Sequence, residues 1–260
     1  MKSTVLITAK DNQLIKNVVK LQSSARFRRE CSLFVLEGMR LCEDALENGV
    51  RFEKILFTQG FREKNQDMLN RFLDNSDESF EVSEVIFNKI SDTHSPQGII
   101  SLCRMAENQD FKFKENGKYL ALENIADPSN LGAICRSAEA LGIDGIIVSS
   151  NGCDPYSPKV LRASMGTVLR MPVYITLDFI NLLKDNKLTK YACVVNECAE
   201  KLTDIKFNKG CICLIGNEGS GLSDEAVNLC EYSITIPMSG RVESLNASVA
   251  AAIVMWEMVK

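Results

Sequence analysis

The second half of the chain alternates short apolar runs with segments of helical periodicity, and this alternation constrains the fold more than any other feature. The apolar runs lie at residues 119–122, 145–148, 191–195, 211–215 and 234–236. Strands that are apolar on both sides and separated by helices are typical of a largely parallel sheet covered by helices on both faces. The pattern therefore predicts an α/β fold for this half.

The first half has the pattern of a smaller α/β unit. We expect strands at residues 52–57, around 80–82 and at 99–103, a helix over 84–90, and an amphipathic helix that begins after Gly38 and ends at Asn48-Gly49. Residues 106–117 are polar and lack periodicity. These observations predict a first domain over residues 1–105, a linker over 106–117 and a second domain over 118–260.

Composition and apolar run lengths exclude several protein classes. The chain has 30 Lys and Arg against 34 Asp and Glu, a net charge of −4 and 45% apolar residues, values that are ordinary for a globular protein and not for a disordered one. The longest apolar run, near residues 249–254, is much shorter than the ~20 residues of a membrane span. The N-terminus has no signal-peptide pattern, so we expect no membrane association and a cytoplasmic location.

The cysteines and the single histidine limit the available chemistry. Ten cysteines occur without a Cys-x-x-Cys pair, so we interpret them as buried free thiols rather than disulfides or zinc ligands. His94 is the only histidine, which excludes a histidine-rich metal site and leaves a Ser/His/Asp triad without a suitably placed base. We expect no metal.

The N-terminal segment is basic although the whole chain is acidic. Residues 1–29 contain seven Lys and Arg against Asp11 alone. Attraction of phosphate depends on the local field more than on net charge, so this segment is a candidate surface for binding a polyanion. The alternative is a solvated helix face. The candidate polyanion-binding residues, which the family resemblance described below makes candidates for binding RNA, are Lys16, Lys20, Arg26, Arg28 and Arg29.

The first of three motifs, Asp-Pro-x-Asn-x-Gly-x-x-x-Arg at residues 127–136, leads from a strand through a turn into a helix. At 100° per residue Arg136 points away from the apolar stripe that includes Leu131 and Ile134, and Gly132 lies one turn before it on the same face. A glycine beside a cation leaves room for an anionic ligand. The alternative is a solvent-facing arginine after an ordinary turn.

Two further motifs follow apolar strands. Gly-Asn-Glu-x-x-Gly-Leu at residues 216–222 differs from the dinucleotide fingerprint Gly-x-Gly-x-x-Gly, and it could also be a plain flexible turn. Ile-Pro-Met-x-Gly-x-x-x-Ser-Leu-Asn-x-Ser at residues 236–248 leads into a nearly all-apolar helix, which Ser244 or Asn246 can cap. Such a helix must be buried in the domain or against a second subunit.

Taken in order, the three motifs resemble the SpoU (TrmH-like) branch of the SPOUT RNA methyltransferases. The basic segment, Glu37-Gly38 and Pro96-Gln97-Gly98 look like the small RNA-binding domain that often precedes the catalytic domain in this family. The resemblance implies a C-terminal SPOUT domain with a parallel sheet and a deep trefoil knot. It also implies S-adenosylmethionine as cofactor and a homodimer whose active site uses both subunits.

The implied reaction is methyl transfer from S-adenosylmethionine to a ribose 2′-hydroxyl of structured RNA, with ribosomal RNA favoured over transfer RNA. By match to the family's motifs, the cofactor-binding positions are Gly216, Asn217, Gly219, Ile236, Met238 and Leu245. The family's polar catalytic positions match Asn130, Arg136, Glu218, Ser244 and Asn246.

Arg136 is poorly suited to act as a base, because a guanidinium keeps its proton. We interpret Arg136 as an electrostatic clamp for a phosphate and the forming alkoxide, with Glu218 or a phosphate receiving the proton. Two alternatives remain at this point: a catalytically inactive RNA- or ribosome-binding protein on the same fold, and a nicotinamide-dependent oxidoreductase, which would lack its usual early fingerprint.

Overall fold

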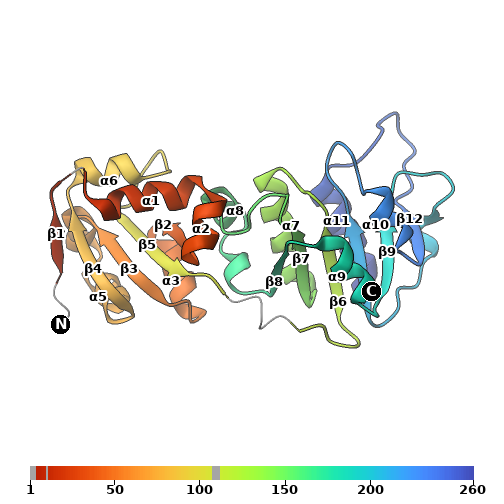
Figure 1. The fold of residues 1–260 in the computed structure, drawn as a ribbon, viewed down its shortest axis with the longest axis horizontal. Coiled ribbons are helices and arrows are strands. Elements are labelled where there is room, and N and C mark those ends of the chain that lie inside the picture. Colours follow the sequence, from red (N-terminus) through yellow and green to blue (C-terminus); the bar gives the residue numbers. More distant parts are fainter. Residues whose placement is uncertain (1–3, 10, 107–111) are drawn as a thin grey trace. The chain divides into compact units, whose positions relative to one another are not determined.

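The computed structural model describes residues 4–9, 11–106 and 112–260, and the chain divides into two compact units. Unit 1 comprises the chain up to Ala106 together with Tyr156–Leu169, and unit 2 comprises the remainder. Residues 107–111 of the expected linker lie outside the described residues. Figure 1 shows the helices and strands of both units.

Unit 1 is built on a five-stranded mixed sheet with the order β1-β4-β3-β5-β2. Its strands are β1 (Val5–Ile7), β2 (Leu33–Glu37), β3 (Phe52–Phe57), β4 (Ser76–Val82) and β5 (Ile99–Arg104). Strand β4 pairs in parallel with β1 and β3, whereas β5 is antiparallel to both β3 and β2. Its helices are α1 (Gln13–Ser23), α2 (Ala25–Cys31), α3 (Met39–Glu47), α4 (Gln59–Lys64), α5 (Gln66–Asp74), α6 (Glu84–Ile90), α8 (Pro158–Ala163) and the 3-10 helix η2 (Thr167–Leu169).

The core of unit 1 follows from amphipathic helices on the sheet. Helix α1 begins where the Asn12 side chain accepts a hydrogen bond from Leu14 N at 2.8 Å, and it buries Ile15, Val18 and Leu21. These side chains share one apolar cluster with residues of α6 and of the sheet. Helices α3 and α5 contact each other and form a second set on the strands.

Unit 1 contains a segment from far along the chain. Tyr156–Leu169 belongs to it, although the predicted boundaries placed this segment in the second domain. The ring of Tyr156 lies 4.9 Å from that of Phe34, measured between centroids, and helix α8 contacts β2. Strands β1 and β2 were not predicted.

Unit 2 is built on a seven-stranded sheet with the order β10-β12-β9-β11-β6-β7-β8, in which every pairing is parallel. Its strands are β6 (Lys118–Leu122), β7 (Gly145–Ser149), β8 (Val173–Thr176), β9 (Thr189–Cys193), β10 (Glu200–Lys201), β11 (Cys211–Ile215) and β12 (Tyr232–Thr235). Its helices are α7 (Pro128–Leu141), α9 (Phe179–Asp185), the 3-10 helix η3 (Leu202–Asp204), α10 (Asp224–Asn228) and α11 (Ala247–Val259). The predicted α/β fold with a parallel sheet is confirmed.

Helices pack on the sheet of unit 2 in two pairs. Helices α9 and α10 contribute Phe179, Leu183 and Ala226 to an apolar cluster with β6, β7 and β11. Helices α7 and α11 contact each other, and α11 also contacts β6 and β11. Because all strands are parallel, the loops that follow β6, β9, β11 and β12 emerge at the same edge of the sheet.

Of the helices in the described residues, none combines the length and the hydropathy needed to cross a membrane.

Candidate active site

A pocket of about 440 Å³ lies at the carboxyl ends of β9, β11 and β12. Three segments line it: the residues that follow β9, the 216–222 loop and the chain between β12 and α11. All six residues that the resemblance assigns to the cofactor line this pocket, namely Gly216, Asn217, Gly219, Ile236, Met238 and Leu245. Glu218 and Ser244 line it as well.

The 216–222 loop is a tight backbone turn that requires glycine at its first position. A Cβ on Gly216 would lie 2.1 Å from the carbonyl carbon of Gly221, closer than any side chain allows. Asn217 N donates to Gly221 O at 3.0 Å, and Gly221 N donates back to Asn217 O at 2.9 Å. The Asn217 side-chain oxygen also accepts from Gly219 N at 2.9 Å. The wall of the pocket here is therefore fixed backbone, not a flexible turn.

Glu218 links this loop to the start of helix α7. Its carboxylate accepts hydrogen bonds from Ala126 N at 3.0 Å, from Asp127 N at 3.1 Å and from Asn130 Nδ2 at 2.8 Å. These donors lower the pKa of Glu218 although desolvation by partial burial, the largest single influence, acts to raise it. Glu218 is therefore an anion held by donors, and this makes it a weak proton acceptor.

Asn130 and Asn246 extend the same chain of hydrogen bonds to the third motif. The oxygen of the Asn130 side chain accepts from Asn246 Nδ2 at 2.9 Å. Asn246 in turn caps α11 by accepting from Ser248 N at 3.0 Å. One residue from each of the three motifs thus joins a single network, Glu218 to Asn130 to Asn246, and of the two expected cap residues Asn246 is the one that caps the helix.

Arg136 stands apart from the pocket within one chain. It is exposed on α7, six residues after Asn130, which is about 9 Å along a helix axis. It does not line the pocket, and within the described residues its side chain makes no hydrogen bond or ion pair. The structure therefore brings together Asn130, Glu218 and Asn246 but leaves Arg136 facing solvent.

Sequence reasoning missed several residues that shape this site. Asn124, in the left-handed region with φ of 57°, offers its carbonyl oxygen to Asn217 Nδ2 at 2.8 Å. The buried Glu123 carboxylate accepts from Ser223 N at 2.8 Å and from Ser223 Oγ at 2.7 Å, and so holds the far end of the loop. Val194 and Val195 line the pocket after β9, and the rule that parallel strands present ligand sites at their carboxyl ends could have identified them.

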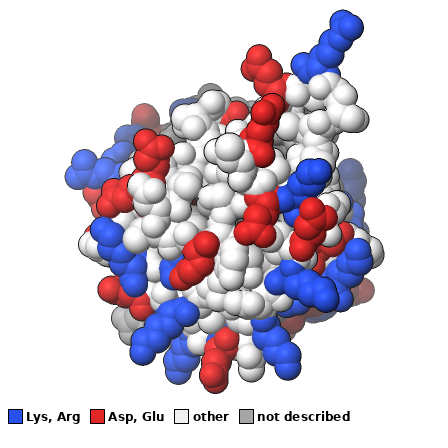
Figure 2. Space-filling model, turned by 90° about the vertical axis from the view of Figure 1, so that its right-hand side faces the viewer, with Lys and Arg blue, Asp and Glu red and all other residues white. Residues whose placement is uncertain are grey.

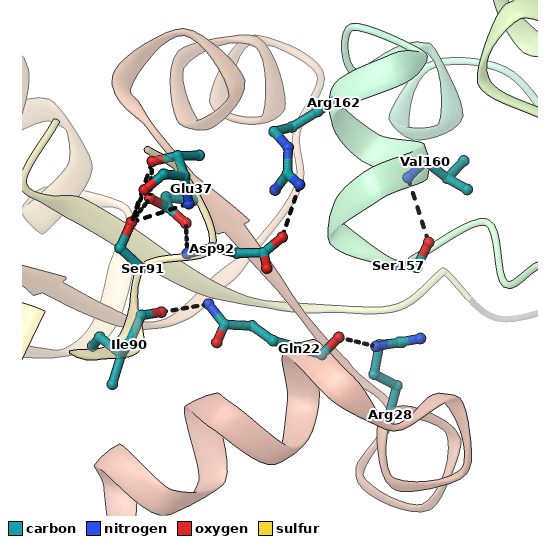
Figure 3. A network of polar contacts seen from close by, with 10 residues as sticks. Gln22, Arg28, Glu37, Ile90, Ser91, Asp92, Ser157, Val160 and Arg162 are labelled. Atoms are coloured by element: carbon teal, nitrogen blue, oxygen red, sulfur yellow. Dashed lines mark hydrogen bonds and ion pairs between the residues drawn. The ribbon is translucent and has the colours of Figure 1, made fainter. Parts of the chain in front are cut away.

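The basic segment of unit 1 differs from expectation at one residue. Lys16, Lys20, Arg26 and Arg29 are exposed, and Arg26 Nε lies 2.6 Å from Glu30 Oε1. Arg28, by contrast, is 3% exposed, and its guanidinium donates to the carbonyl oxygen of Gln22 (Figure 3) and to that of Leu21, at the end of α1. The prediction that Arg28 binds RNA is therefore wrong, because this side chain closes a helix end in the core. Lys2 and Lys10 lie outside the described residues.

Basic residues do not gather at the end of unit 2 that carries β12 and α10. Figure 2 shows Lys and Arg interspersed with Asp and Glu over that face. An RNA-binding field of one sign is therefore not a property of this part of the surface.

The ten cysteines are all free thiols, as expected, but not all are buried. Cys31 and Cys198 are exposed. Burial raises the pKa of the Cys193 thiol beside the pocket to about 11, so this thiol stays protonated at neutral pH. In the described part of the chain no three His, Cys, Asp or Glu side chains come together in a way that could hold a metal ion.

Comparisons with known proteins agree with the motifs. The model of the SpoU rRNA Methylase family matches residues 117–256, and that of the MRM3-like substrate binding domain matches residues 12–101. An uncharacterized tRNA/rRNA methyltransferase of Synechocystis is 32% identical over 96% of this chain and 92% of its own length. The 23S rRNA (guanosine(2553)-2′-O)-methyltransferase RlmP of Bacillus subtilis is 27% identical over 97% of this chain and 98% of its own.

A solved structure gives the same result for the fold. The AdoMet-bound rRNA methyltransferase from Sinorhizobium meliloti superposes with a TM-score of 0.84 at 27% identity, covering 98% of this chain and 97% of that one. The family match spans more than half of the chain and includes all three motifs that converge on the pocket and its network. The chain therefore belongs to the SpoU rRNA methylase family.

Proposed function

We propose that this protein transfers a methyl group from S-adenosylmethionine to a ribose 2′-hydroxyl in ribosomal RNA. The observation that carries the proposal is the convergence of the 216–222 loop and the 236–246 segment on one pocket, with Glu218, Asn130 and Asn246 joined behind it. Two similar proteins support the details. RlmP of Bacillus subtilis is named as a 23S rRNA 2′-O-methyltransferase, and the Sinorhizobium meliloti structure is described as AdoMet-bound.

The pocket fits S-adenosylmethionine in size and chemistry. Its volume of about 440 Å³ lies within the range of ~300–1,000 Å³ typical of small-molecule sites. Ile236, Met238 and Leu245 offer apolar surface for an adenine ring, and the backbone around Gly216 and Gly219 offers polar groups at a wall that no Cβ obstructs. When bound, the cofactor would supply a methyl group already activated by a sulfonium.

Within this proposal the polar residues hold the site in shape and Arg136 acts on the RNA. Glu218 and Asn130 fix the loop against α7, and Asn246 fixes the start of α11. Arg136 binds a backbone phosphate and stabilises negative charge on the ribose oxygen. Because the Glu218 carboxylate already accepts hydrogen bonds from Ala126 N, Asp127 N and Asn130 Nδ2, the hydroxyl proton passes to solvent water rather than to Glu218.

A second copy of the chain completes the site in this proposal. Helix α11 exposes Val249 (48%), Ile253 (36%) and Trp256 (58%), which are spaced four and three residues apart and so form one apolar stripe. A stripe of this kind on a helix that also borders the pocket network is suited to pairing with its own copy. Pairing through α11 would allow Arg136, which is exposed on the neighbouring helix α7, to serve the partner's pocket.

The deep trefoil knot and the cytoplasmic location are further parts of the proposal. The family membership supports the knot. A substrate in ribosomal RNA supports the location.

The experiment is methyl transfer to ribosomal RNA purified from a strain that lacks this gene. Labelled S-adenosylmethionine should transfer its methyl group to one nucleotide, which reverse-transcription arrest at low nucleotide concentration would map to a ribose. Calorimetry with the cofactor alone separates the inactive alternative, since a protein that only binds RNA would give no heat of binding. Incorporation into a base instead of a ribose would contradict the proposal.

A further inference from the structure

In unit 1 a buried carboxylate accepts its hydrogen bonds from a single surface loop. Glu37, the last residue of β2, is 8% exposed. Its Oε2 accepts from Asp92 N at 2.8 Å, and its Oε1 accepts from Thr93 Oγ1 at 2.6 Å and from Ser91 Oγ (Figure 3). Every one of these donors lies in the loop formed by residues 91–98, here called the 91–98 loop.

The burial of Glu37 is not offset by a cation from the part of the chain that the structure describes. Within the described residues its carboxylate makes no ion pair, and its hydrogen bonds come from neutral groups. Removing a carboxylate from water is costly, and an apolar side chain of similar volume would fill the same space without that cost. What the carboxylate provides is a fixed conformation for the start of the 91–98 loop.

The other end of the loop is held as firmly. The side-chain oxygen of Gln97 accepts from Met39 N at 2.7 Å, at the start of α3. Gly98 has φ of 83°, and a Cβ on it would lie 2.6 Å from Thr58 Oγ1. Its carbonyl oxygen accepts from Thr58 N at 3.0 Å. Both ends of the loop are therefore anchored to the sheet of unit 1.

The tip between these anchors faces solvent. His94, Ser95 and Pro96 are exposed. Across the residues that the structure describes, the side chains of His94 and Ser95 make no hydrogen bond. The anchors therefore do not serve to pack the tip; they present an imidazole and a hydroxyl in a fixed place.

The surroundings of the tip suit a polyanion. The acidic residue of the loop, Asp92, is paired with Arg162 of α8 at 2.7 Å. Gln22 Nε2 of α1 donates to Ile90 O at 2.6 Å, which places the end of the basic helix α1 beside the loop. The elements that contact or adjoin the loop also carry exposed cations: Lys89 on α6, Arg40 on α3 and Lys159 on α8.

We propose that the tip of the 91–98 loop contacts an unpaired nucleotide of the RNA substrate, with His94 stacked on its base, and that Glu37 is the positioning residue of this loop. The inference rests on the proposed function, because it assigns part of the RNA substrate's binding surface. Proteins recognise RNA sequence mainly through unpaired bases stacked on aromatic side chains, including histidine. A single exposed ring on a fixed tip matches an unstacked base rather than a duplex groove.

The direct test is His94→Ala, with ribosomal RNA from a strain that lacks this gene as the substrate. Loss of one stacked base should raise KM for RNA about tenfold, with kcat and the Kd for S-adenosylmethionine unchanged. The slope of RNA affinity against salt should also stay the same, because stacking releases no counterions. Asn70→Ala, at an exposed position of α5 among the second set of helices, is the matched control and should change none of these values.

The role of Glu37 is tested by two substitutions and one combination. Glu37→Leu keeps the core filled but releases the loop, so KM for RNA should rise as in His94→Ala. Glu37→Gln should recover most of the affinity, since its amide oxygen can still accept from Asp92 N and its amide nitrogen can donate to the hydroxyls of Ser91 and Thr93. Because Glu37 acts through the tip, the double variant Glu37→Leu, His94→Ala should be no weaker than either single variant.

Additive losses in the double variant, or an unchanged KM for RNA in His94→Ala, would overturn the inference. Failure of the proposed function would look different: the unmodified protein would not methylate ribosomal RNA. Filter binding of the same RNA would in that case still compare the unmodified protein with His94→Ala. Circular dichroism melting of Glu37→Leu separates a released loop, which leaves the Tm near that of the unmodified protein, from an unfolded unit 1.

Discussion

At the residue scale, the donors around Glu218 determine what its substitution should do. Glu218→Gln keeps the size of the side chain but turns an NH₂ group toward at least one of three N–H donors. We expect weaker S-adenosylmethionine binding and a lower kcat. The shape of the pH–rate profile between about pH 6 and 9 should not change, because a carboxylate with a lowered pKa is ionised throughout that range. Glu225→Gln, on the surface of α10, is the control.

The lowered pKa of Glu218 also determines how its contribution to the stability of the fold changes with pH. The carboxylate of Glu218 stabilises the fold fully above its unfolded pKa, near 4.5, and this stabilisation is lost as pH falls through the lower pKa of the folded state. Urea unfolding of Glu218→Gln should therefore differ most from that of the unmodified protein at neutral pH and least in acid. In the kinetic experiment, an acid limb of the pH–rate profile that is present in the unmodified protein and absent in Glu218→Gln would instead show that Glu218 is the proton acceptor.

Substitution of Gly216 tests whether the backbone of the 216–222 loop forms the cofactor pocket. In Gly216→Ala the new Cβ meets the backbone of Gly221 and Leu222 at 2.1 and 2.2 Å, so the loop must move. Overpacking of this kind costs about 1–3 kcal/mol, and here the displaced atoms form the pocket wall. We expect calorimetry to show at least tenfold weaker cofactor binding. Gly240→Ala, whose Cβ would meet only Val242 at 4.0 Å, should bind as the unmodified protein does.

At the scale of elements, helices α1 and α2 carry two kinds of basic residue: exposed ones that can bind RNA, and one buried arginine that stabilises the fold. Replacing Lys16, Lys20 and Arg29 by Glu should weaken RNA binding and reduce the salt slope by about one for each RNA phosphate that is no longer neutralised. Arg28→Met removes donors to the last turn of α1 instead, so it should lower the Tm of the protein and leave the salt slope unaltered. Filter binding across a salt series, beside thermal melting, distinguishes the two outcomes. Equal slopes for the triple variant and the unmodified protein would place the RNA elsewhere.

The exposed apolar stripe of helix α11 is the surface through which we expect two copies of the chain to pair. Ile253→Asp puts a charge in the middle of the exposed stripe between Val249 and Trp256, and it should convert a dimer to a monomer in sedimentation velocity. Val85→Asp alters a valine that is 61% exposed on α6 of unit 1, and it should leave the mass unchanged. If Ile253→Asp remained a dimer, pairing through α11 would be excluded.

At the scale of the whole molecule, periodicity predicted five of the seven strands in the sheet of unit 2, because these five are short apolar runs separated by helical segments or loops. Strands β8 and β10 were missed, since β8 has only four residues after Pro172 and β10 has only two, both of them charged. The segment Tyr156–Leu169 could not be assigned to unit 1 from sequence, because nothing local marks the long-range ring contact between Phe34 and Tyr156. Arg28 was misjudged for a related reason: burial of a guanidinium depends on carbonyl groups that only the folded helix end supplies.

In the site, too, features set by a local sequence pattern were predicted, whereas features set by the packing of distant segments were not. The resemblance to the family's motifs, rather than their spacing, pointed to the residues that line the pocket wall, and the second and third motifs each follow a strand of one parallel sheet. The helical periodicity did indicate that Arg136 points away from the core, but no local pattern indicated that Glu218 would be surrounded by donors, because that depends on how α7 lies against the loop. The position of Arg136 makes the number of chains per active site the central question about the whole assembly.

Subunit complementation answers that question. Arg136→Ala and Gly216→Ala should each inactivate a homodimer, the first by removing the clamp and the second by closing the pocket. If Arg136 serves the partner's pocket, a mixed dimer has one intact site, made of the pocket from the Arg136→Ala chain and the arginine from the Gly216→Ala chain. Random reassociation would then restore about a quarter of the unmodified activity, because half of the dimers are mixed and each has one working site. If Arg136 instead serves the pocket of its own chain, every site in the mixture carries a defect and no activity returns on mixing.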